Sequence, residues 1–373
     1  MSHVLLTGAT GVIGGAVLEG LLGLKDATVS LLLRGADDAA AERRRDELLA
    51  DLLEPEAAAA ARSRVHALRG DITRARLGLE PAAHGELGER CTHIIHCAAQ
   101  IRMNLPREAA RAAAVDGTEH VLGFARTVRG LRKLEVVSTI GVGGRLPEVA
   151  EDWLAEPRLF HNTYEEAKAE AETLVHRAQA ELPVTVHRPS MVVGDSLTGQ
   201  VRAFQVFYHL CEFLSGIRSR GLSPQLGAAR VDTVPMDYVV RGLLWSLDHA
   251  EAAGRVLHQC AGPDAMPLAV LQPLVRERFR AAGVRVPSLV SLPVWCFRAL
   301  LRPLTVVAPA KLRRALRTAP VLLDYLTEHQ LFHNEHTRAT LAADGIELPA
   351  PAAYLPRVID YYLERRPARQ RKS

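Results

Sequence analysis

The chain of 373 residues is sparing in several residue types, and each shortage narrows the kinds of site it can contain. Its five cysteines include no Cys-x-x-Cys pair and no close Cys/His cluster, so nothing indicates a zinc site or another metal centre. Aromatic residues make up 5% and no long basic run occurs, which argues against a nucleic-acid partner although the net charge is +4. The apolar and charged fractions, 48% and 24%, are those of an ordinary globular protein.

Long apolar runs are also missing. Arg or Pro interrupts the longest apolar stretches within about a dozen residues, so the sequence predicts no transmembrane segment. The first expected strand begins so close to Met1 that no room is left for a signal peptide. An odd number of cysteines without a signal peptide predicts reduced thiols and a cytoplasmic protein. The sequence does not indicate an oligomeric state.

What the chain does have is a glycine-rich opening. An apolar run at the N-terminus leads into a glycine-rich stretch (7–15) and an apolar periodic segment (12–24). This order of strand, turn and helix is the context of a dinucleotide-binding loop. In such a loop Gly8 permits the tight turn, Gly11 lets the backbone approach a pyrophosphate, and Gly14 lets the helix pack closely on the strand. The free N–H groups at the start of the helix then face the phosphates.

Tyr164 and Lys168 lie four residues apart in a strongly helix-forming stretch (162–170), so they share one helix face. A phenol ordinarily titrates near pH ~10, and a neighbouring ammonium favours the phenolate and lowers that pKa. The pair is then a proton donor or acceptor for interconversion of a carbonyl and an alcohol. The alternative is a surface helix with an incidental Tyr and Lys.

An expected strand (134–139) ends in hydroxyl residues before this helix, and Thr139 therefore lies where open α/β sheets bind ligands. With the glycine loop, Thr139 and the Tyr-x-x-x-Lys pair, the chain resembles an extended short-chain dehydrogenase/reductase. The resemblance implies an α/β fold with a Rossmann-type, doubly wound parallel sheet. It also implies that Thr139, Tyr164 and Lys168 are catalytic, and that Lys168 in addition holds the nicotinamide ribose.

The residues at the ends of the next expected strands indicate which cofactor binds and which residues contact it. The second expected strand ends at Arg34, where an arginine accommodates a 2′-phosphate and an acidic residue would bind the ribose 2′-OH, so NADPH is favoured over NADH. Asp71 and Ile72 resemble the family's adenine-contacting pair, the alternative being a simple Gly-Asp turn. Ala98 and Ala99 end the fourth strand, and their small side chains would let the cofactor pass over the backbone.

Three later segments (188–199, 231–237 and 332–362) resemble one branch of this family, the fatty acyl-CoA reductases and carrier-protein thioester reductases. The branch resemblance implies hydride delivery to the thioester of an acyl-CoA or an acyl-carrier protein, giving an aldehyde, and it leaves open whether an alcohol follows. The cofactor contacts implied by the family are Gly8, Thr10, Gly11, Val12, Ile13, Gly14, Arg34, Asp71, Ile72, Ala98, Ala99, Lys168, Pro189, Ser190 and Val192.

One position departs from the family pattern. The family's Asn-Val-x-Gly-Thr segment here begins with Ala114, so the amide that can support a proton relay is missing. The departure does not bear on cofactor binding, but it leaves the route of proton resupply to Tyr164 open.

Expected strands and helices alternate through the first half of the chain, which is the pattern of a parallel sheet with helices on both faces. We expect residues 1–262 to form the nucleotide-binding domain, with its core at 1–194 and later strands interleaved near 230–260. A smaller, mostly helical portion that covers the substrate is expected at 263–373, with a contribution from 195–229.

Four further segments carry structural expectations. The sequence predicts a helix at 36–62 that Pro55 interrupts, a helix at 202–216 and a strand near 230–234. The apolar segment 290–314, broken by Arg and Pro, is compatible with three arrangements. It can form a helical hairpin packed on the domain, an apolar wall of an acyl tunnel, or a peripheral contact with a membrane interface.

The leading interpretation is therefore an NADPH-dependent reductase of an acyl thioester. Only the branch resemblance supports the thioester, because the residues themselves do not distinguish it from a ketone. One alternative is a ketone/aldehyde or hydroxysteroid-type dehydrogenase with the same triad. A nucleotide-sugar epimerase is disfavoured because its usual arginine pattern is not evident after position 200. A non-catalytic NADP-binding sensor would typically lose the tyrosine or the lysine, and both are present.

Overall fold

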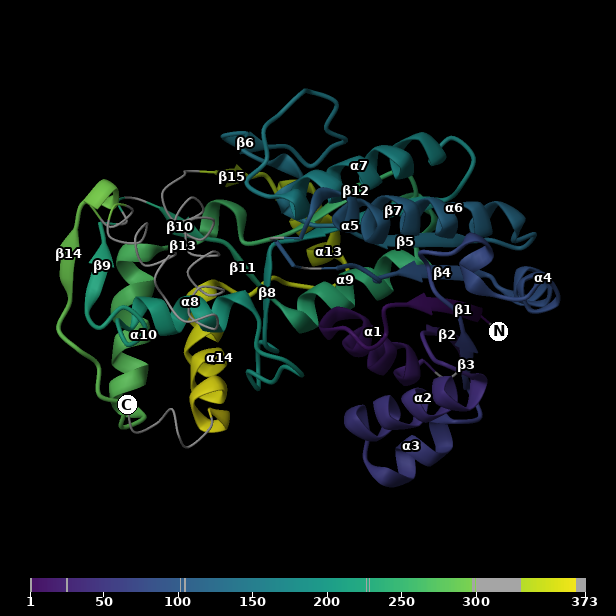
Figure 1. The fold of residues 1–373 in the computed structure, drawn as a ribbon, viewed down its shortest axis with the longest axis horizontal. Coiled ribbons are helices and arrows are strands. Elements are labelled where there is room, and N and C mark those ends of the chain that lie inside the picture. The colour runs from purple at the N-terminus through teal and green to yellow at the C-terminus, as the bar shows by residue number, and fades with distance from the viewer. Residues whose placement is uncertain are drawn as a thin grey trace.

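The computed structural model describes residues 2–366 except 25, 101, 104, 226, 228, 297–298 and 300–329. A sheet with helices on both faces occupies one end of the elongated molecule, and a smaller, mostly helical region occupies the other (Figure 1). This arrangement confirms the predicted α/β class with a helical C-terminal portion.

The main sheet has seven strands, all paired in parallel. In spatial order they are β12 (Val256–Gln259), β7 (Val184–Pro189), β5 (Lys133–Val137), β4 (His93–His96), β1 (Ser2–Thr7), β2 (Ala27–Leu33) and β3 (Val65–Arg69). The chain runs from β1 outward to β3 and then returns to β4 on the other side of β1. The carboxyl ends of β1 and β4 therefore bound the crevice in which such sheets bind ligands.

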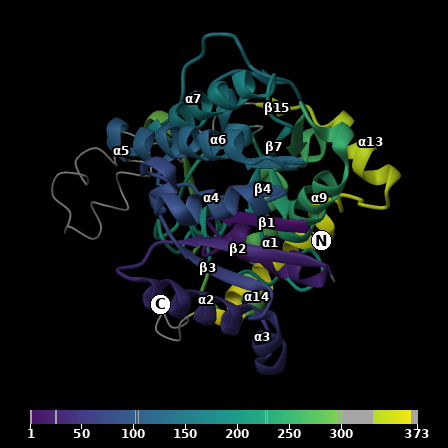
Figure 2. The same ribbon diagram turned by 90° about the vertical axis from the view of Figure 1, so that its right-hand side faces the viewer.

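Helices cover both faces of this sheet. One face carries α1 (Val12–Gly23), α2 (Asp38–Leu52) and α9 (Met236–Asp248), and the other carries α4 (Pro81–Arg90), α6 (Gly117–Thr127) and α7 (Thr163–Ala178). Figure 2 shows α6 and α7 on one side of the strands and α2 with α3 (Pro55–Ala61) on the other. Because every residue of β5, β7 and β12 is buried, these strands read as unbroken buried runs in the sequence.

The predicted interruption of the helix at 36–62 can be compared directly with these elements. The helix expected at 36–62 is divided as predicted, since α2 ends at Leu52 and α3 begins at Pro55, where proline fits the first turn.

Before α6, the short helix α5 (Arg107–Arg111) continues through a π-helical turn, η2 (Ala112–Asp116). This turn contains Ala114, so the departure from the family pattern lies at a π-bulge, a feature frequent at functional sites.

The second region is built from short strand pairs and three packed helices. Its helices α8 (Val206–Leu214), α10 (Leu268–Ala281) and α14 (Pro351–Arg365) share one apolar core. Helix α13 (Glu335–Ala343) contributes instead to a smaller core with α9 and β12. The strand pairs are β8 (Met191–Val193) with β11 (Thr233–Pro235), β10 (Arg230–Val231) with β13 (Met266–Pro267), β9 (Leu222–Pro224) with β14 (Val290–Leu292), and β6 (Glu148–Val149) with β15 (Leu331–Phe332). Short helical turns are η1 (Ala75–Gly78), η3 (Ile140–Gly143), η4 (Ala250–Ala252) and η5 (Gly262–Asp264).

Three expectations for this region need correction. The strand expected near 230–234 is two strands, because β10 pairs with β13 and β11 pairs with β8, and Asp232 between them belongs to neither. The helix expected from residue 202 begins only at Val206. Residues 290–292 form β14 rather than part of a helical hairpin, because they pair with β9. Most of the remaining segment up to 314 lies outside the described residues.

Helix α14 is fixed to its surroundings by polar contacts between distant parts of the chain. The Tyr354 hydroxyl bonds both the hydroxyl and the carbonyl oxygen of Thr233, at 2.8 and 2.9 Å. Tyr362 donates to the buried carboxylate of Glu212 at 2.6 Å, and Arg278 pairs with Asp360. These contacts hold α14 against β11, α8 and α10.

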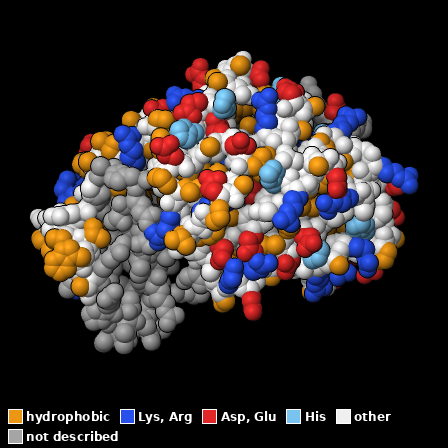
Figure 3. Space-filling model, turned by 90° about the horizontal axis from the view of Figure 1, so that it is seen from above, with side chains coloured by type: hydrophobic (Ala, Val, Ile, Leu, Met, Phe, Trp, Pro, Cys, Tyr) orange, Lys and Arg blue, Asp and Glu red, His pale blue; other side chains and the backbone are white. Residues whose placement is uncertain are grey.

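The surface carries charges of both signs. On the face shown in Figure 3, Lys and Arg side chains lie among Asp and Glu side chains. Several pairs span neighbouring helices, such as Arg107 with Glu166 at 2.8 Å. Within the part of the chain that the structure describes, no helix combines the length and apolarity needed to cross a membrane.

Candidate active site

The glycine loop joins β1 to α1 at the crevice. Gly8 has a φ of +76°, a conformation that L side chains rarely adopt, and a Cβ there would lie 2.5 Å from the backbone nitrogen of Ala98. The N–H of Gly11 donates to the carbonyl of Gly8 at 2.9 Å, which closes the turn. A Cβ on Gly14 would collide with that same carbonyl. Close backbone approach therefore requires glycine at positions 8 and 14, whereas a Cβ at position 11 would lie 3.1 Å from the Gly8 carbonyl oxygen.

The start of α1 has the properties of an anion-binding helix end. Its N-cap, Gly11, offers no side-chain hydrogen bond, and the first turn contains no acidic residue. The first N–H groups of the helix therefore remain available for a phosphate. Thr10 is exposed in this loop, and Val12 and Ile13 begin the helix.

The fourth strand forms the opposite side of the crevice. The Thr7 hydroxyl bonds His96 at 2.8 Å and accepts the N–H of Ala98 at 3.3 Å, so the ends of β1 and β4 are joined by side chains as well as by the sheet. Ala98 is half-buried and Ala99 is exposed. Burial lowers the pKa of His96 to about 3, so this imidazole is neutral, and its neighbour Lys168 acts in the same direction.

Three predicted catalytic residues meet at the carboxyl end of β5. Thr139 caps η3, where its hydroxyl accepts the N–H of Gly141 at 3.1 Å. Tyr164 and Lys168 project from the first two turns of α7, whose N-cap Asn162 accepts the N–H of Glu165 at 3.0 Å. The Thr139 hydroxyl hydrogen-bonds the Tyr164 phenol.

The pKa of Tyr164 shifts in the direction opposite to the sequence-based expectation. Burial raises it to about 12, the nearby Glu165 carboxylate adds to this, and the hydrogen bond from Thr139 only partly opposes it. The expected lowering of the tyrosine pKa by Lys168 does not prevail. Burial lowers the pKa of that lysine to about 8, so Lys168 is already neutral at the pH where the phenol would lose its proton. Near neutral pH the tyrosine is therefore a proton donor rather than a phenolate.

Lys168 is 5% exposed, and its Nζ donates to the carbonyl of Val137 at 2.9 Å. Its strongest favourable charge is Glu172, one turn further along α7. Glu172 in turn accepts from Ser138 at 2.7 Å and from the fully buried Arg188. No role for Glu172 follows from the sequence, in which its only signal is that it lies four residues after the lysine on the same helix face.

The remaining predicted cofactor residues lie at the ends of other strands. Arg34 is exposed immediately after β2, and its carbonyl accepts from Arg44 at 2.8 Å. Asp71 follows β3 and accepts the N–H and the hydroxyl of Thr73, each at 2.9 Å. Ile72 packs against Gly117 at the start of α6. All of them lie after the carboxyl ends of their strands.

Residues after β7 form the far side of the site. Pro189 ends β7, Ser190 is buried beside it, and Val192 lies in β8. The Ser190 hydroxyl faces Asp232, whose carboxylate accepts the N–H groups of residues 261 and 262 at 2.8 and 2.7 Å. Burial raises the pKa of Asp232 to about 6. This carboxylate was part of a recognised motif, but only the structure places it beside Ser190.

Ala114 is buried among the side chains of Ala110, Val115, Ala167 and Ala171. Two of these belong to α7, so the position where the family has an amide is here an apolar contact between η2 and the catalytic helix. A proton relay through this position therefore has no side-chain group to use.

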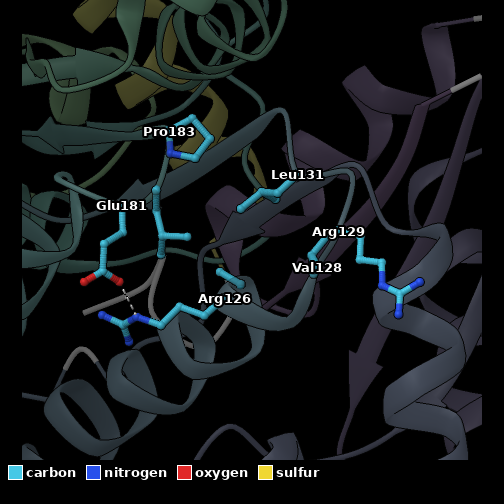
Figure 4. Close-up of a pocket in the computed structure, with 8 residues that line it drawn as sticks. Arg126, Val128, Arg129, Leu131, Glu181 and Pro183 are labelled. Carbon is cyan, nitrogen blue, oxygen red and sulfur yellow. Dashed lines mark hydrogen bonds and ion pairs between the residues drawn. The ribbon is translucent and has the colours of Figure 1, made fainter.

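One surface hollow, of about 360 Å³, has no part in this site. Figure 4 shows it between the segments that precede β5 and β7, with Arg126 paired to Glu181 at its edge. It therefore lies at the amino ends of the strands, whereas Thr139 and Ser190 follow the carboxyl ends. Ligands of open parallel sheets bind at the carboxyl ends.

Comparisons with known proteins agree with this geometry. Residues 6–243 match the family described as male sterility protein. The isonitrile lipopeptide synthase of Streptomyces coeruleorubidus is 34% identical over 246 residues, which are 65% of this chain but only 16% of that protein. The chain thus spans a small part of this curated relative.

Two solved structures are similar over almost the whole chain. The terminal R domain from the myxalamid PKS-NRPS biosynthetic pathway has a TM-score of 0.80 and 26% identity, covering 98% of this chain and 91% of that one. A thiolation-reductase di-domain from an archaeal non-ribosomal peptide synthetase has a TM-score of 0.75 and 23% identity, covering 97% and 75%. The chain therefore belongs to the male sterility protein family and is an oxidoreductase of the extended short-chain dehydrogenase/reductase type.

Proposed function

We propose that this protein uses NADPH to reduce an acyl thioester presented by a carrier protein, and that it releases an aldehyde. The observation that carries the proposal is the meeting of Thr139, Tyr164 and Lys168 beside the crevice between Gly8 and Ala98. The thioester is supported by the relatives, since one similar structure joins a reductase to a thiolation domain. The triad by itself is equally suited to a ketone or an aldehyde.

The crevice fits a dinucleotide. The uncapped start of α1 suits a pyrophosphate, and the close contact between Gly8 and Ala98 leaves backbone rather than side chains along its floor. Arg34 is exposed after β2, where a guanidinium can bind a 2′-phosphate with two parallel hydrogen bonds. When bound, the nicotinamide supplies the hydride.

Side chains of this protein stabilise the negative charge that develops on the substrate. Negative charge grows on the acyl carbonyl oxygen as the hydride adds, and donors fixed in advance stabilise it. Tyr164, protonated because burial raises its pKa to about 12, donates its proton to this oxygen and so gives a hemithioacetal, whose C–S bond then breaks to release the aldehyde and the free thiol of the carrier. Thr139 is oriented by the N–H of Gly141 and keeps its own hydrogen for the phenol or the substrate oxygen. The Lys168 ammonium, one turn further along the same helix, adds positive charge to the site.

The test is NADPH oxidation with acyl groups on a carrier protein, the same acyl groups on coenzyme A, the matching aldehydes and a ketosteroid, with products identified by mass. Tyr164→Phe should lower kcat by about 10²- to 10⁴-fold. Tyr361→Phe is the matched control, because Tyr361 lies on α14 away from the triad.

Aldehyde or alcohol formed from the carrier-bound thioester, with dependence on Tyr164, supports the proposal, and the product mass gives the number of electrons transferred. Turnover with aldehyde or ketosteroid alone would instead identify a dehydrogenase with the same triad. Inertness toward all substrates, with NADPH still bound, would identify a cofactor-binding sensor.

A further inference from the structure

A buried charged cluster lies directly behind the proposed catalytic residues. Arg188, at the end of β7, is fully buried and donates from Nε to the Glu172 carboxylate at 3.0 and 3.2 Å. Its Nη2 donates to the same carboxylate, and its Nη1 reaches the carbonyl of Asp152 at 2.9 Å and the ring of His258 at 3.0 Å. Ser138 donates to the other side of the same carboxylate at 2.7 Å. Glu172 thus receives bonds from β5 and β7 while it belongs to α7.

Such a cluster is not explained by stability. Moving a carboxylate and a guanidinium out of water is costly, and well-packed apolar residues of similar volume often stabilise a fold as well or better. The cluster occurs at the point where three elements that carry site residues converge. Ser138 precedes Thr139, Arg188 precedes Pro189 and Ser190, and Glu172 follows Lys168 on its helix face. A residue in this position can hold the neighbouring site residues in a constant arrangement.

The charges that face Lys168 point to the same role. Besides its bond to the Val137 carbonyl, Lys168 is faced by Cys97 and His96 from β4 and by Glu172 from α7, with Tyr164 one turn earlier. Burial raises the pKa of the Cys97 thiol to about 12 and lowers that of His96 to about 3, so both are neutral near pH 7. Among these described neighbours, Glu172 is the group that supplies negative charge to the buried ammonium.

We propose that Glu172 is a positioning residue which, held by Arg188 and Ser138, keeps Lys168 charged and in place on the helix that also carries Tyr164. This inference rests on the proposed function, in which Lys168 acts as an ammonium. In this proposal Arg188 orients the Glu172 carboxylate. Ser138 links the same carboxylate to the end of β5, where Thr139 lies.

The chain offers a direct measurement, because it contains only five lysines. In protein labelled with ¹³C at lysine Cε, each ammonium can be titrated by NMR, and Lys168→Arg identifies the resonance of Lys168. The proposal requires a wild-type midpoint above 7, so that Lys168 is an ammonium near neutral pH although burial lowers its pKa to about 8. A wild-type midpoint below 7 would overturn it without any variant of the cluster.

The variants separate charge from shape. Glu172→Gln keeps the shape and loses the charge, and it should lower the Lys168 midpoint by about one pH unit, since opposite charges within ~4–6 Å shift a pKa by that order or more. Glu172→Asp keeps the charge and should restore most of the midpoint. Lys133 is the internal control, because its buried ammonium is balanced by Glu135 and Glu251 and should titrate alike in all three proteins.

Activity should follow the same order. The alkaline fall of kcat/KM should move to lower pH in Glu172→Gln and return toward wild type in Glu172→Asp, with KM for the thioester changing less than kcat. A purely structural role predicts the reverse ranking, with glutamine better than aspartate and no movement of either midpoint. That outcome would overturn the proposal.

The two proposals fail separately. If no thioester is reduced by the wild-type protein, the proposed function fails, while the lysine titration still decides the role of Glu172. If Glu172→Gln does not fold, the wild-type midpoint and Glu172→Asp together decide it.

Discussion

The sheet region and the region around α14 are held together by contacts of different range. In the sheet, neighbouring strands pair through backbone hydrogen bonds, and β1 meets β2 after a single helical crossover. Helix α14 instead depends on side chains far apart in sequence: Arg278 and Asp360 are 82 residues apart, Thr233 and Tyr354 are 121 apart, and Glu212 and Tyr362 are 150 apart. Figure 1 places the two regions at opposite ends of the molecule.

This difference in contacts implies that substitutions in the two regions have different effects. The cofactor crevice is shaped by backbone geometry, with glycines where chain segments touch, so its tolerance to an added Cβ is low. The region around α14 depends on the side-chain contacts given above and on a close backbone approach between Gly199 and Arg357 of α14. Substitutions in the first region should therefore affect cofactor binding, and those in the second should affect stability while cofactor binding persists.

The largest effect should come from Gly14→Val. Its side chain would collide with the Gly8 carbonyl and push the loop away from the helix, and overpacking of this kind costs about 1–3 kcal/mol. We expect NADPH affinity to fall by roughly tenfold to hundredfold, measured by the fluorescence of bound NADPH. Gly23→Ala at the end of the same helix is the control, because no other atom lies within 4 Å of its Cβ position. Equal affinities for the two variants would contradict the role of the glycine loop.

Acid should destabilise the sheet region through two buried histidines. Burial lowers the pKa of His96, beside the crevice, and of His258, which bridges Arg188 and the His333 carbonyl, to about 3 in each case. The unfolded chain binds protons below about 6.5, whereas these two side chains remain neutral in the fold. The stability they allow is therefore fully present above 6.5 and is lost as the pH falls toward 3, by about 1.4 kcal/mol per pH unit for each histidine.

Urea unfolding at a series of pH values checks this expectation. The free energy of unfolding should fall steadily below pH 6.5, and His96→Gln and His258→Gln should each flatten the decline. A flat profile down to pH 5 in the wild-type protein would show that these histidines are protonated without cost.

This comparison also explains what the sequence could and could not predict. The strands of the sheet are continuous buried runs, and the glycine loop and the Tyr-x-x-x-Lys pair are local patterns, so their positions follow from short windows of sequence. The break at Asp232 and the pairing of β14 with β9 depend on partners elsewhere in the chain, and no local signal specifies them.

The electrostatics of the site were less predictable than its location. The spacing of Tyr164 and Lys168, together with the surrounding motifs, identifies the pair, but the sign of the tyrosine pKa shift depends on burial, which a sequence window does not contain. Glu172 and Arg188 are 16 residues apart, and each looks like an ordinary charged residue until α7 and β7 are brought together. Ala114 was visible as a departure from the family, whereas its apolar contact with α7 was not.

A smaller effect is expected at Arg34. If its guanidinium binds a 2′-phosphate, Arg34→Ala removes a charge-assisted hydrogen bond worth about 1.5–3 kcal/mol and should weaken NADPH binding by about tenfold or more. Binding of NADH, which lacks the phosphate, should change little, so the same variant provides its own control. Equal losses for the two cofactors would show that Arg34 acts on the loop rather than on the phosphate.

The smallest effect should come from Tyr354→Phe, and it tests the second region. The substitution leaves the ring in the core of α14 but leaves the Thr233 hydroxyl and carbonyl without the Tyr354 hydroxyl. A buried polar group without its partner costs about 1–3 kcal/mol, so the free energy of unfolding should fall by roughly that amount. Tyr361→Phe on the same helix is the control, since its half-buried hydroxyl makes none of these bonds and its loss should cost little. NADPH affinity should be unchanged in both variants, because the crevice lies in the sheet region and Thr233 contacts α14 rather than the glycine loop. A loss of NADPH binding in Tyr354→Phe would mean that α14 shapes the crevice itself, and the separation of the two regions would then be wrong.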